Sequence, residues 1–283
     1  MGSPTEQSHD GEVPFHPGEL RLQEMFNEQA KAKRISFSVR RGFVDRTAKS
    51  LAGMSLLAVT VRVGDILECF LLSGPPGFLC ARDTTTLVIA PEHPLPGRLL
   101  DACRAGTSIG TTGADFTSGV RVRVNGIARV ENDGVIVVST DEVFPNCKLH
   151  VAARQSLPHA ADGEPVLSPE DWVPSAQLLF IASERGDGSG LDIAHRAGPP
   201  GFIELTGGRL RYEDYYGNGL YQSHGSLDLH PRATILVVDL EQGRGLAFQG
   251  STTLDVTDDM SRRWVAIDIT SIEPAQMPPG AGP

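Results

Sequence analysis

The chain has 283 residues, of which 40% are hydrophobic and 21% are charged, and its formal net charge at neutral pH is -10. It is long and apolar enough to form two hydrophobic cores, which excludes an intrinsically disordered protein. The acidic balance argues against nucleic acid as a partner, because nucleic-acid binders carry basic stripes that contact phosphates.

Other simple classes are also disfavoured. No apolar run approaches the roughly 20 residues that a membrane-spanning helix needs, and the amino terminus lacks the pattern of a signal peptide. We therefore predict a cytoplasmic protein with no membrane partner. The four cysteines form no C-x-x-C pair, which favours buried, reduced thiols. His224 and His230 lack metal-ligand spacing and a third ligand, so we predict no metal site.

The amino-terminal part is predicted to be an extension, residues 1–42, that contains a short helix. The spacing of apolar residues indicates an amphipathic helix over residues 18–32, and a second helix is predicted over residues 44–52. The second helix leads directly into the first domain, which we place at residues 43–153.

From residue 55 onward the pattern changes to short β-strands with little helix. Strands are predicted at 55–61, 66–73, 86–90, 107–115, 120–130 and 135–139, with a short helical stretch around 99–104. About six short strands are typical of a small antiparallel barrel rather than a βαβ sheet.

A polar segment with Pro and Gly predicts a linker at residues 154–169. Ser168 is a candidate helix N-cap, with Pro169 at the first helical position. Strands follow at 177–183, 191–197, 202–205, 209–213, 232–240, 245–256 and 264–272. They define a second domain at residues 170–274, followed by a tail at 275–283.

The two domains are related by an internal duplication. Residues 73–78 read Ser-Gly-Pro-Pro-Gly-Phe, and residues 197–202 read Ala-Gly-Pro-Pro-Gly-Phe. The same offset aligns Val-Asn-Gly at 124–126 with Phe-Gln-Gly at 248–250. Because Pro and Gly end strands, each phrase predicts a strand end followed by a rigid turn. A structural turn without chemistry is the simpler interpretation of the phrase itself.

The copies differ where chemistry is expected. Residues 68–72 read Glu-Cys-Phe-Leu-Leu, whereas the aligned residues 192–196 read Asp-Ile-Ala-His-Arg. An apolar pair of the first copy has thus become His195 and Arg196 in the second.

A candidate phosphate site follows in the second copy. Arg211 lies on a predicted strand, Asn218 lies in the loop after it, and Ser223 opens a short predicted helix. A helix N-terminus beside a hydroxyl and an arginine combines the donors and positive charge that bind phosphate. The alternative is a solvated turn in which the arginine pairs with Glu213 or Asp214 at the surface.

These features resemble a known family. The repeated phrase, Val-Phe-Pro-Asn-Cys-Lys at 143–148, and the run at 192–202 followed by Asp-Tyr-Tyr-Gly-Asn at 214–218 resemble tandem members of the pyridoxamine 5'-phosphate oxidase-like, FMN-binding split-barrel proteins. The start of the chain, from residue 15 to 20, is similar to the same group, so the resemblance covers about residues 15–270. It implies a mainly β fold of two tandem Greek-key split β-barrels that form an intrachain pseudo-dimer, with FMN in the cleft between them.

The resemblance also implies roles for individual residues. His195 and Arg196 match the strand that faces FMN, and Asn218 and Ser223 match the segment that holds its phosphate. Two residues at the end of the first barrel, Asn146 and Lys148, match positions that reach the cleft from the other side. His195 is the candidate catalytic residue, as a proton donor, with a structural histidine as the alternative.

The resemblance predicts one flavin site, because the first copy lacks the His-Arg pair. It also predicts an FMN-dependent oxidoreductase, an oxidase or a reductase, that acts on a small-molecule substrate. The chain would be a monomer or a homodimer of the pseudo-dimer. Gly219 stands where related sequences have a basic residue, a change that removes a phosphate contact worth about 1.5–3 kcal/mol. A non-enzymatic flavin or haem carrier or sensor, and a protein with a decayed site, are therefore alternatives.

Overall fold

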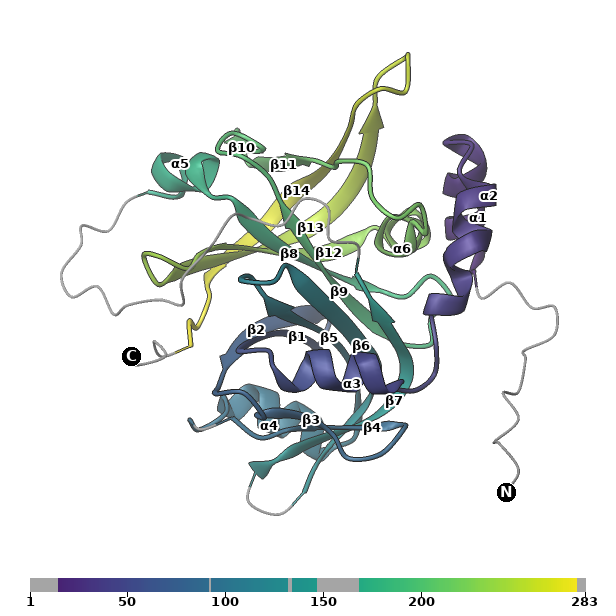
Figure 1. Cartoon of the computed structure of the whole chain (residues 1–283). Helices are drawn as coiled ribbons and strands as arrows, with labels where there is room; N and C mark the ends of the chain where they lie inside the picture. Colours follow the sequence, from purple (N-terminus) through teal and green to yellow (C-terminus); the bar gives the residue numbers. More distant parts are fainter. Residues whose placement is uncertain (1–14, 92, 132–133, 147–167, 279–283) are drawn as a thin grey trace.

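Two seven-stranded antiparallel sheets make up most of the protein, and helices are few (Figure 1). The computed structural model describes residues 15–91, 93–131, 134–146 and 168–278. The fold is mainly β, as predicted, and the two sheets are consistent with tandem split-barrel domains. The predicted linker lies almost entirely outside the described residues, so the domain boundaries stay a prediction.

The amino-terminal region is helical (Figure 1). Its first two helices lie to one side of the sheets, whereas its last helix packs against the first sheet. Its elements are α1 (Pro17–Met25), α2 (Gln29–Ile35), a 3-10 turn η1 (Ser36–Ser38) and α3 (Asp45–Ala52). The prediction of one helix over residues 18–32 is wrong. The chain breaks at Asn27, whose φ of 53° lies in the left-handed region that asparagine tolerates better than most residues.

The first sheet has the strand order β2-β1-β5-β6-β7-β4-β3. Its strands are β1 (Leu56–Val63), β2 (Ile66–Ser73), β3 (Leu79–Ala81), β4 (Thr86–Ile89), β5 (Thr107–Asp115), β6 (Val120–Val130) and β7 (Ile136–Pro145), with α4 (Gly97–Arg104) between β4 and β5. Strand β3 was not predicted because it has three residues. Strand β7 continues past its predicted end at Ser139. Exposed and buried residues still alternate there, but some of the buried ones are polar, so the apolar pattern ends before the strand does.

The second sheet repeats this topology. Its elements are α5 (Pro169–Trp172), η3 (Val173–Ser175), β8 (Leu178–Glu184), β9 (Leu191–Ala197), β10 (Ile203–Thr206), β11 (Arg209–Glu213), α6 (Gln222–Leu229), β12 (Arg232–Asp239), β13 (Arg244–Val256) and β14 (Arg263–Pro274). The order β9-β8-β12-β13-β14-β11-β10 matches the first sheet strand for strand. The predicted N-cap is confirmed, since the Ser168 amide donates to the Asp171 carboxylate at 3.2 Å.

The duplicated phrase forms the same turn in both copies. In each, the phenylalanine amide donates to the first proline carbonyl at 3.0 Å. The last glycine has a positive φ, 99° at Gly77 and 90° at Gly201. The first glycine, Gly74 or Gly198, lies against the phenylalanine ring of its own phrase. The phrase is therefore a strand end and a rigid turn, as predicted.

Both sheets also have a β-bulge at the aligned Asn-Gly and Gln-Gly positions. The strand register shifts between Asn125 and Gly126 of β6, and between Gln249 and Gly250 of β13. A side chain at either glycine would collide with a backbone carbonyl of the neighbouring strand. Glycine at these positions lets both strands bend.

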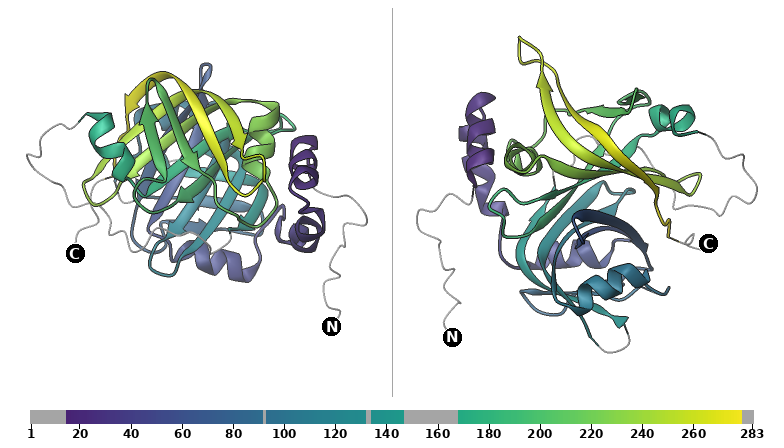
Figure 2. Two further views of the ribbon diagram at one scale, coloured as in Figure 1. Left: turned by 90° about the horizontal axis from the view of Figure 1, so that it is seen from above. Right: turned by 180° about the vertical axis from the view of Figure 1, so that it is seen from behind.

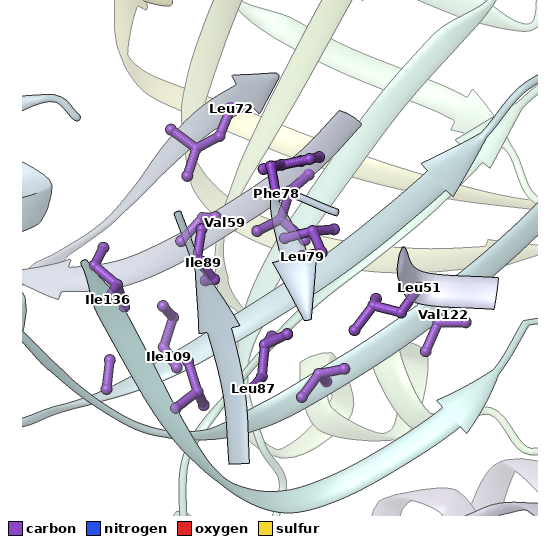
Figure 3. Packing of buried hydrophobic residues seen from close by; sticks show 14 of the residues in the cluster. Leu51, Val59, Leu72, Phe78, Leu79, Leu87, Ile89, Ile109, Val122 and Ile136 are labelled. Atoms are coloured by element: carbon purple, nitrogen blue, oxygen red, sulfur yellow. The ribbon is translucent and has the colours of Figure 1, made fainter. Parts of the chain in front are cut away.

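Three hydrophobic clusters hold the chain together. In the first, Leu51 of α3 packs with strand residues such as Val59 and Ile136 inside the first sheet (Figure 3). The second cluster has the corresponding place in the second sheet. The third lies between the sheets, which face each other in both views of Figure 2, and includes Leu71 of β2 and Phe180 of β8.

Strand β9 borders both the second core and the interface between the sheets. Ala194 belongs to the second core, whereas its neighbour Ile193 belongs to the interface cluster. Because successive strand residues point to opposite faces, His195 lies on the interface side and Arg196 on the core side. The adjacent pair of the sequence analysis thus leaves β9 on opposite faces, although both side chains line the same cleft.

Two further predictions concern the cysteines and the membrane. Cys69 and Cys103 are buried free thiols, as predicted, but Cys80 is exposed, and Cys147 lies outside the described residues. Within the described segments, no helix combines the length and the apolar character needed to cross a membrane.

Replacing Gly198 by alanine is expected to lower the free energy of unfolding by about 1–3 kcal/mol, because the new Cβ would lie 2.5 Å from the Phe202 ring. Urea denaturation measures the change. Gly97→Ala is the control, since a Cβ there meets nothing within 4 Å, and it is expected not to lower stability. Equal losses in both variants would contradict a steric role for Gly198.

Candidate functional site

A cleft of about 110 Å³ opens between the two sheets, beside the end of β9 and the start of α6. Four of its described lining residues are arginines, so we call it the arginine cleft. Its lining residues come from β6, the end of β7, β9, the segment between β11 and α6, α6 itself and β14: Arg121, Arg123, Phe144, Asn146, His195–Ala197, Glu213–His224 and Arg263.

Asp214 is the centre of one half of the cleft. Its carboxylate accepts from Nε of Arg196 and from Nε of Arg263, each at 2.8 Å, and lies 3.2 Å from Nε2 of His224. Burial alone would raise the pKa of this carboxyl, but His224, Arg196 and Arg263 together hold the pKa well below its usual range. Asp214 is therefore a permanent anion that fixes two guanidinium groups from β9 and β14.

Arg263 joins this half to an aromatic wall. Its Nη1 donates to the Tyr221 hydroxyl at 3.0 Å, and its guanidinium lies about 5 Å from the ring centres of Phe26, Tyr216 and Tyr221. Phe26, from the amino-terminal extension, stacks on Tyr221 with a centroid distance of 5.2 Å. The extension thus packs behind Tyr221, which lines the cleft.

Asp192 is the centre of the other half and joins the two sheets. Although it lies on β9, it accepts from Arg123 at 2.8 Å and from Asn125 at 3.1 Å, both on β6 of the first sheet. The hydroxyl of Ser223 donates to the same carboxylate at 3.0 Å. Asn125 also links this group to Glu142, whose carboxylate accepts hydrogen bonds from Asn125 and Gln222. Burial raises the pKa of the Glu142 carboxyl. The first sheet therefore contributes its own charged residues to the cleft.

His195 also contacts the first sheet. Its Nδ1 lies 2.6 Å from Nη1 of Arg121, and its ring packs against Phe116 and Phe180. Burial lowers the pKa of His195 well below its ordinary value, and the nearby arginines lower it further. The imidazole is therefore neutral at physiological pH.

The helix α6 begins beside these groups. Tyr221, at its N-cap, has a φ of 60°, and the first turn carries Ser223 and His224. This eight-residue helix turns its amide end, and therefore its positive dipole end, toward the cleft. On its far side Gly225 packs so closely on Gly18 of α1 that neither position accommodates a side chain.

The structure brings together most of the predicted site residues. His195, Arg196, Asn218, Ser223 and Asn146 all line the cleft. Lys148 lies outside the described residues.

Arg211 is not brought into this group. Its side chain is exposed, pairs with Glu204 at 2.7 Å and packs on Trp264. The predicted strand is correct, but on β11 the alternation directs residue 211 away from the core in which residues 210 and 212 lie.

The sequence analysis missed four residues of the cleft: Arg121, Arg123, Arg263 and His224. The signal for two of them was present in the repeat. At the offset that revealed His195, Arg121 and Arg123 align with Gly245 and Ala247, so these arginines also distinguish one copy from the other. At the counterpart of the cleft these two arginines are replaced by small residues, and beside Gly245 lie Met277 and Ala275.

The sequence analysis interpreted Gly219 as the loss of a basic phosphate contact, whereas the structure shows a steric reason for glycine at this position. Its φ is 80°, and a Cβ there would lie 2.6 Å from Oε2 of Glu28 and 3.2 Å from Lys31. These two residues belong to the α2 region and form an ion pair of 2.9 Å. The amino-terminal extension thus fills the space that a longer residue at 219 would need, and it brings its own lysine to the loop.

No protein-family model matches the chain, and no curated protein matches it. Among solved structures, HupZ of Group A Streptococcus is 16% identical, covering 42% of this chain and 100% of its own, with a TM-score of 0.31. The conserved hypothetical protein Rv2991 of Mycobacterium tuberculosis is 16% identical over 42% of this chain and 89% of its own, with a TM-score of 0.29. The Bacillus subtilis inhibitor of motility, MotI, is 10% identical over 78% of this chain and 88% of its own, with a TM-score of 0.23. These similarities are distant and assign no function.

Asp214→Asn is expected to lower the free energy of unfolding by about 3–5 kcal/mol at neutral pH, because it leaves buried guanidinium groups without their counter-charge. The pKa of Asp214 is lowered in the folded state, so its contribution is complete above the unfolded pKa and is lost as the pH falls below it. The gap between wild type and variant should therefore narrow below about pH 4.

Urea denaturation at several pH values measures that gap. Glu213→Gln is the matched control. The carboxylate of Glu213, which precedes Asp214 in the chain, pairs with the exposed Arg262 at 2.8 Å, and a surface pair contributes about 1 kcal/mol or less. A pH-independent gap for Asp214→Asn would show that shape, rather than charge, makes this residue important.

Gly219→Lys is expected to lower the melting temperature by several degrees, since it combines a strained backbone with a collision against Glu28. Gly217→Lys, in the same loop, meets nothing within 4 Å and should melt like the wild type. Thermal unfolding followed by circular dichroism compares them. An unchanged melting temperature in Gly219→Lys would mean that the α2 region does not hold this loop.

Proposed function

We propose that this chain is a flavoprotein of the FMN-binding split-barrel type, and that its arginine cleft holds the phosphate end of FMN. The bound flavin would supply hydride or electron transfer to a small-molecule substrate, while the chain binds and orients both. We also propose one flavin per chain. The positions that align with His195, Arg121 and Arg123 are Leu71, Gly245 and Ala247, which carry no comparable set of charges.

The observation that carries the proposal is the arginine cleft itself. Three of its four guanidinium groups pair with buried carboxylates, Arg123 with Asp192 and both Arg196 and Arg263 with Asp214. The carboxylate of Glu213 is paired with Arg262 outside the cleft. Among the described residues of the cleft and their partners, positive charge exceeds negative charge. Guanidinium groups bind phosphate oxygens in pairs, and the Ser223 hydroxyl and the start of α6 add further donors.

The residues fit a phosphate better than they fit a whole nucleotide. A volume of about 110 Å³ is below the range of about 300–1,000 Å³ that small-molecule sites usually have. It accommodates a phosphate group, while a ring system would have to extend past the exposed Tyr216 at the edge of the cleft. We therefore infer that FMN binding moves the segment 213–221.

Haem, the alternative cofactor, is supported less well. An axial imidazole needs a free nitrogen lone pair, whereas Nδ1 of His195 contacts Arg121 and Nε2 of His224 lies beside Asp214. A site that has decayed is also disfavoured, since arginines from both sheets and the Ser223 hydroxyl still line one cleft. A flavin carrier or sensor shares the same cleft and differs in having no turnover.

The first test is the visible absorption spectrum of the purified protein, followed by titration with FMN and with riboflavin. We expect FMN at about one per chain and an affinity at least tenfold above that of riboflavin, which lacks the phosphate. A haem spectrum, or equal affinities for the two flavins, would contradict the proposal.

The matched variants are Arg196→Gln, inside the cleft, and Arg211→Gln, outside it. Arg196→Gln is expected to weaken FMN binding about tenfold or more while leaving riboflavin binding nearly unchanged, and Arg211→Gln should change neither. The riboflavin comparison separates a lost phosphate contact from a general loss of structure. If Arg196→Gln discriminates between the flavins as the wild type does, the phosphate is held elsewhere.

A further inference from the structure

The contact between Arg121 and His195 determines which imidazole nitrogen carries the proton. Nη1 of Arg121 lies 2.6 Å from Nδ1 of His195. A guanidinium has donors and no acceptor, so Nδ1 must accept this hydrogen bond. When His195 is neutral, its proton is therefore on Nε2. An arginine of the first sheet thus sets the tautomer of a histidine on the second sheet.

The surroundings of His195 oppose a second proton. The charged groups that face it are Arg121 and Arg123 from β6 and Arg196 from its own strand. From the other directions its ring meets Phe180 of β8 and Phe116 after β5. A buried cation that faces three guanidinium groups is strongly disfavoured, because it loses its hydration and is repelled by like charges. The imidazole therefore stays neutral well below the ordinary histidine pKa.

The other nitrogen is left for a ligand. His195 is 3% exposed and lines the arginine cleft, and its Nε2 is buried with no hydrogen-bond partner among the described residues. A buried donor without an acceptor is costly, and such groups in native structures call for an explanation. An acceptor atom of a molecule bound in the cleft supplies one.

We propose that His195 is a fixed neutral donor, Nε2–H, to an acceptor atom of the cleft's ligand, and that Arg121 is the positioning residue that holds this tautomer. The acceptor is a carbonyl oxygen, an unprotonated ring nitrogen or an anionic oxygen. In this role His195 orients and discriminates between ligands, and it does not transfer a proton. The identity of the ligand rests on the proposed function, but the state of the histidine does not.

The state of His195 is tested on the full chain without ligand. Nitrogen-15 NMR of histidine-labelled protein distinguishes the two tautomers and the imidazolium, and His195→Leu, which carries the residue found at the aligned position 71, identifies the signals. We expect the Nε2–H form from about pH 5.5 to pH 8. The Nδ1–H form, or titration near the ordinary pKa, would overturn the proposal.

Variants of Arg121 test the positioning role. Arg121→Lys keeps a donor and a charge and should keep the Nε2–H form. Arg121→Leu removes both, so the pKa of His195 should rise and the tautomer should become mixed. A circular dichroism spectrum and melting curve show whether each variant is folded, and Arg121→Lys decides the question if Arg121→Leu does not fold. An unchanged His195 in folded Arg121→Leu would overturn the role of Arg121.

The ligand contact is tested with FMN as the probe. His195→Leu is expected to weaken binding about tenfold, whereas His195→Gln, whose amide can both accept from Arg121 and donate, should bind within about threefold of the wild type. Wild-type affinity for riboflavin, which has no titrating phosphate, should be constant between about pH 6 and pH 8. Equal binding by His195→Leu would overturn the ligand contact. If the wild type binds no FMN, the proposed function fails, and the NMR result still decides the state of His195.

Discussion

The ion pair between Arg123 and Asp192 joins the two halves of the molecule at the point where its chemistry is concentrated. One partner comes from β6 of the first sheet and the other from β9 of the second, and both are buried. A buried charge is tolerated when it is paired and hydrogen-bonded. Here Ser223 and Asn125 donate the further hydrogen bonds that the Asp192 carboxylate accepts. Ordering the cleft therefore requires both sheets at once. Each sheet by itself would expose an unpaired charge.

Asp214 has the complementary task within the second half. It neutralises part of the charge of Arg196 and Arg263 without removing their donor groups from the cleft. Two buried anions thus allow three buried cations and the half-buried Arg196 to lie near one another. The remaining excess of positive charge is the feature that an anionic ligand would complete, and the aromatic residues around Arg263 limit how far water screens it.

The duplication shows how, among the described residues, one of two similar positions became the arginine cleft. The two sheets share strand order, bulges and turns, so their backbones offer two equivalent positions. At the first, the side chains are His195, Arg121 and Arg123; at the second, the aligned residues are Leu71, Gly245 and Ala247. The three residues of the second position are apolar, and Gly245 lies beside Met277. Two sheets with the same topology therefore carry different sites, because a small number of side chains differ between them.

The sequence by itself determined the mainly β class, the duplication, nearly all of the strands and a group of residues that the structure does bring together. These features depend on local patterns: alternation of apolar residues, Pro-Gly turns and a repeat that can be aligned. Arg211 shows the limit of this reasoning, because a correct strand still leaves open which way one side chain points. Tertiary structure alone decided that Arg121 and Arg123 face His195 and Asp192, that Asp214 is a buried anion rather than a surface partner, and that the amino-terminal helices fill the space beside Gly219. The physical reason is that burial and pairing of charge arise between segments far apart in the chain, where no local pattern records them.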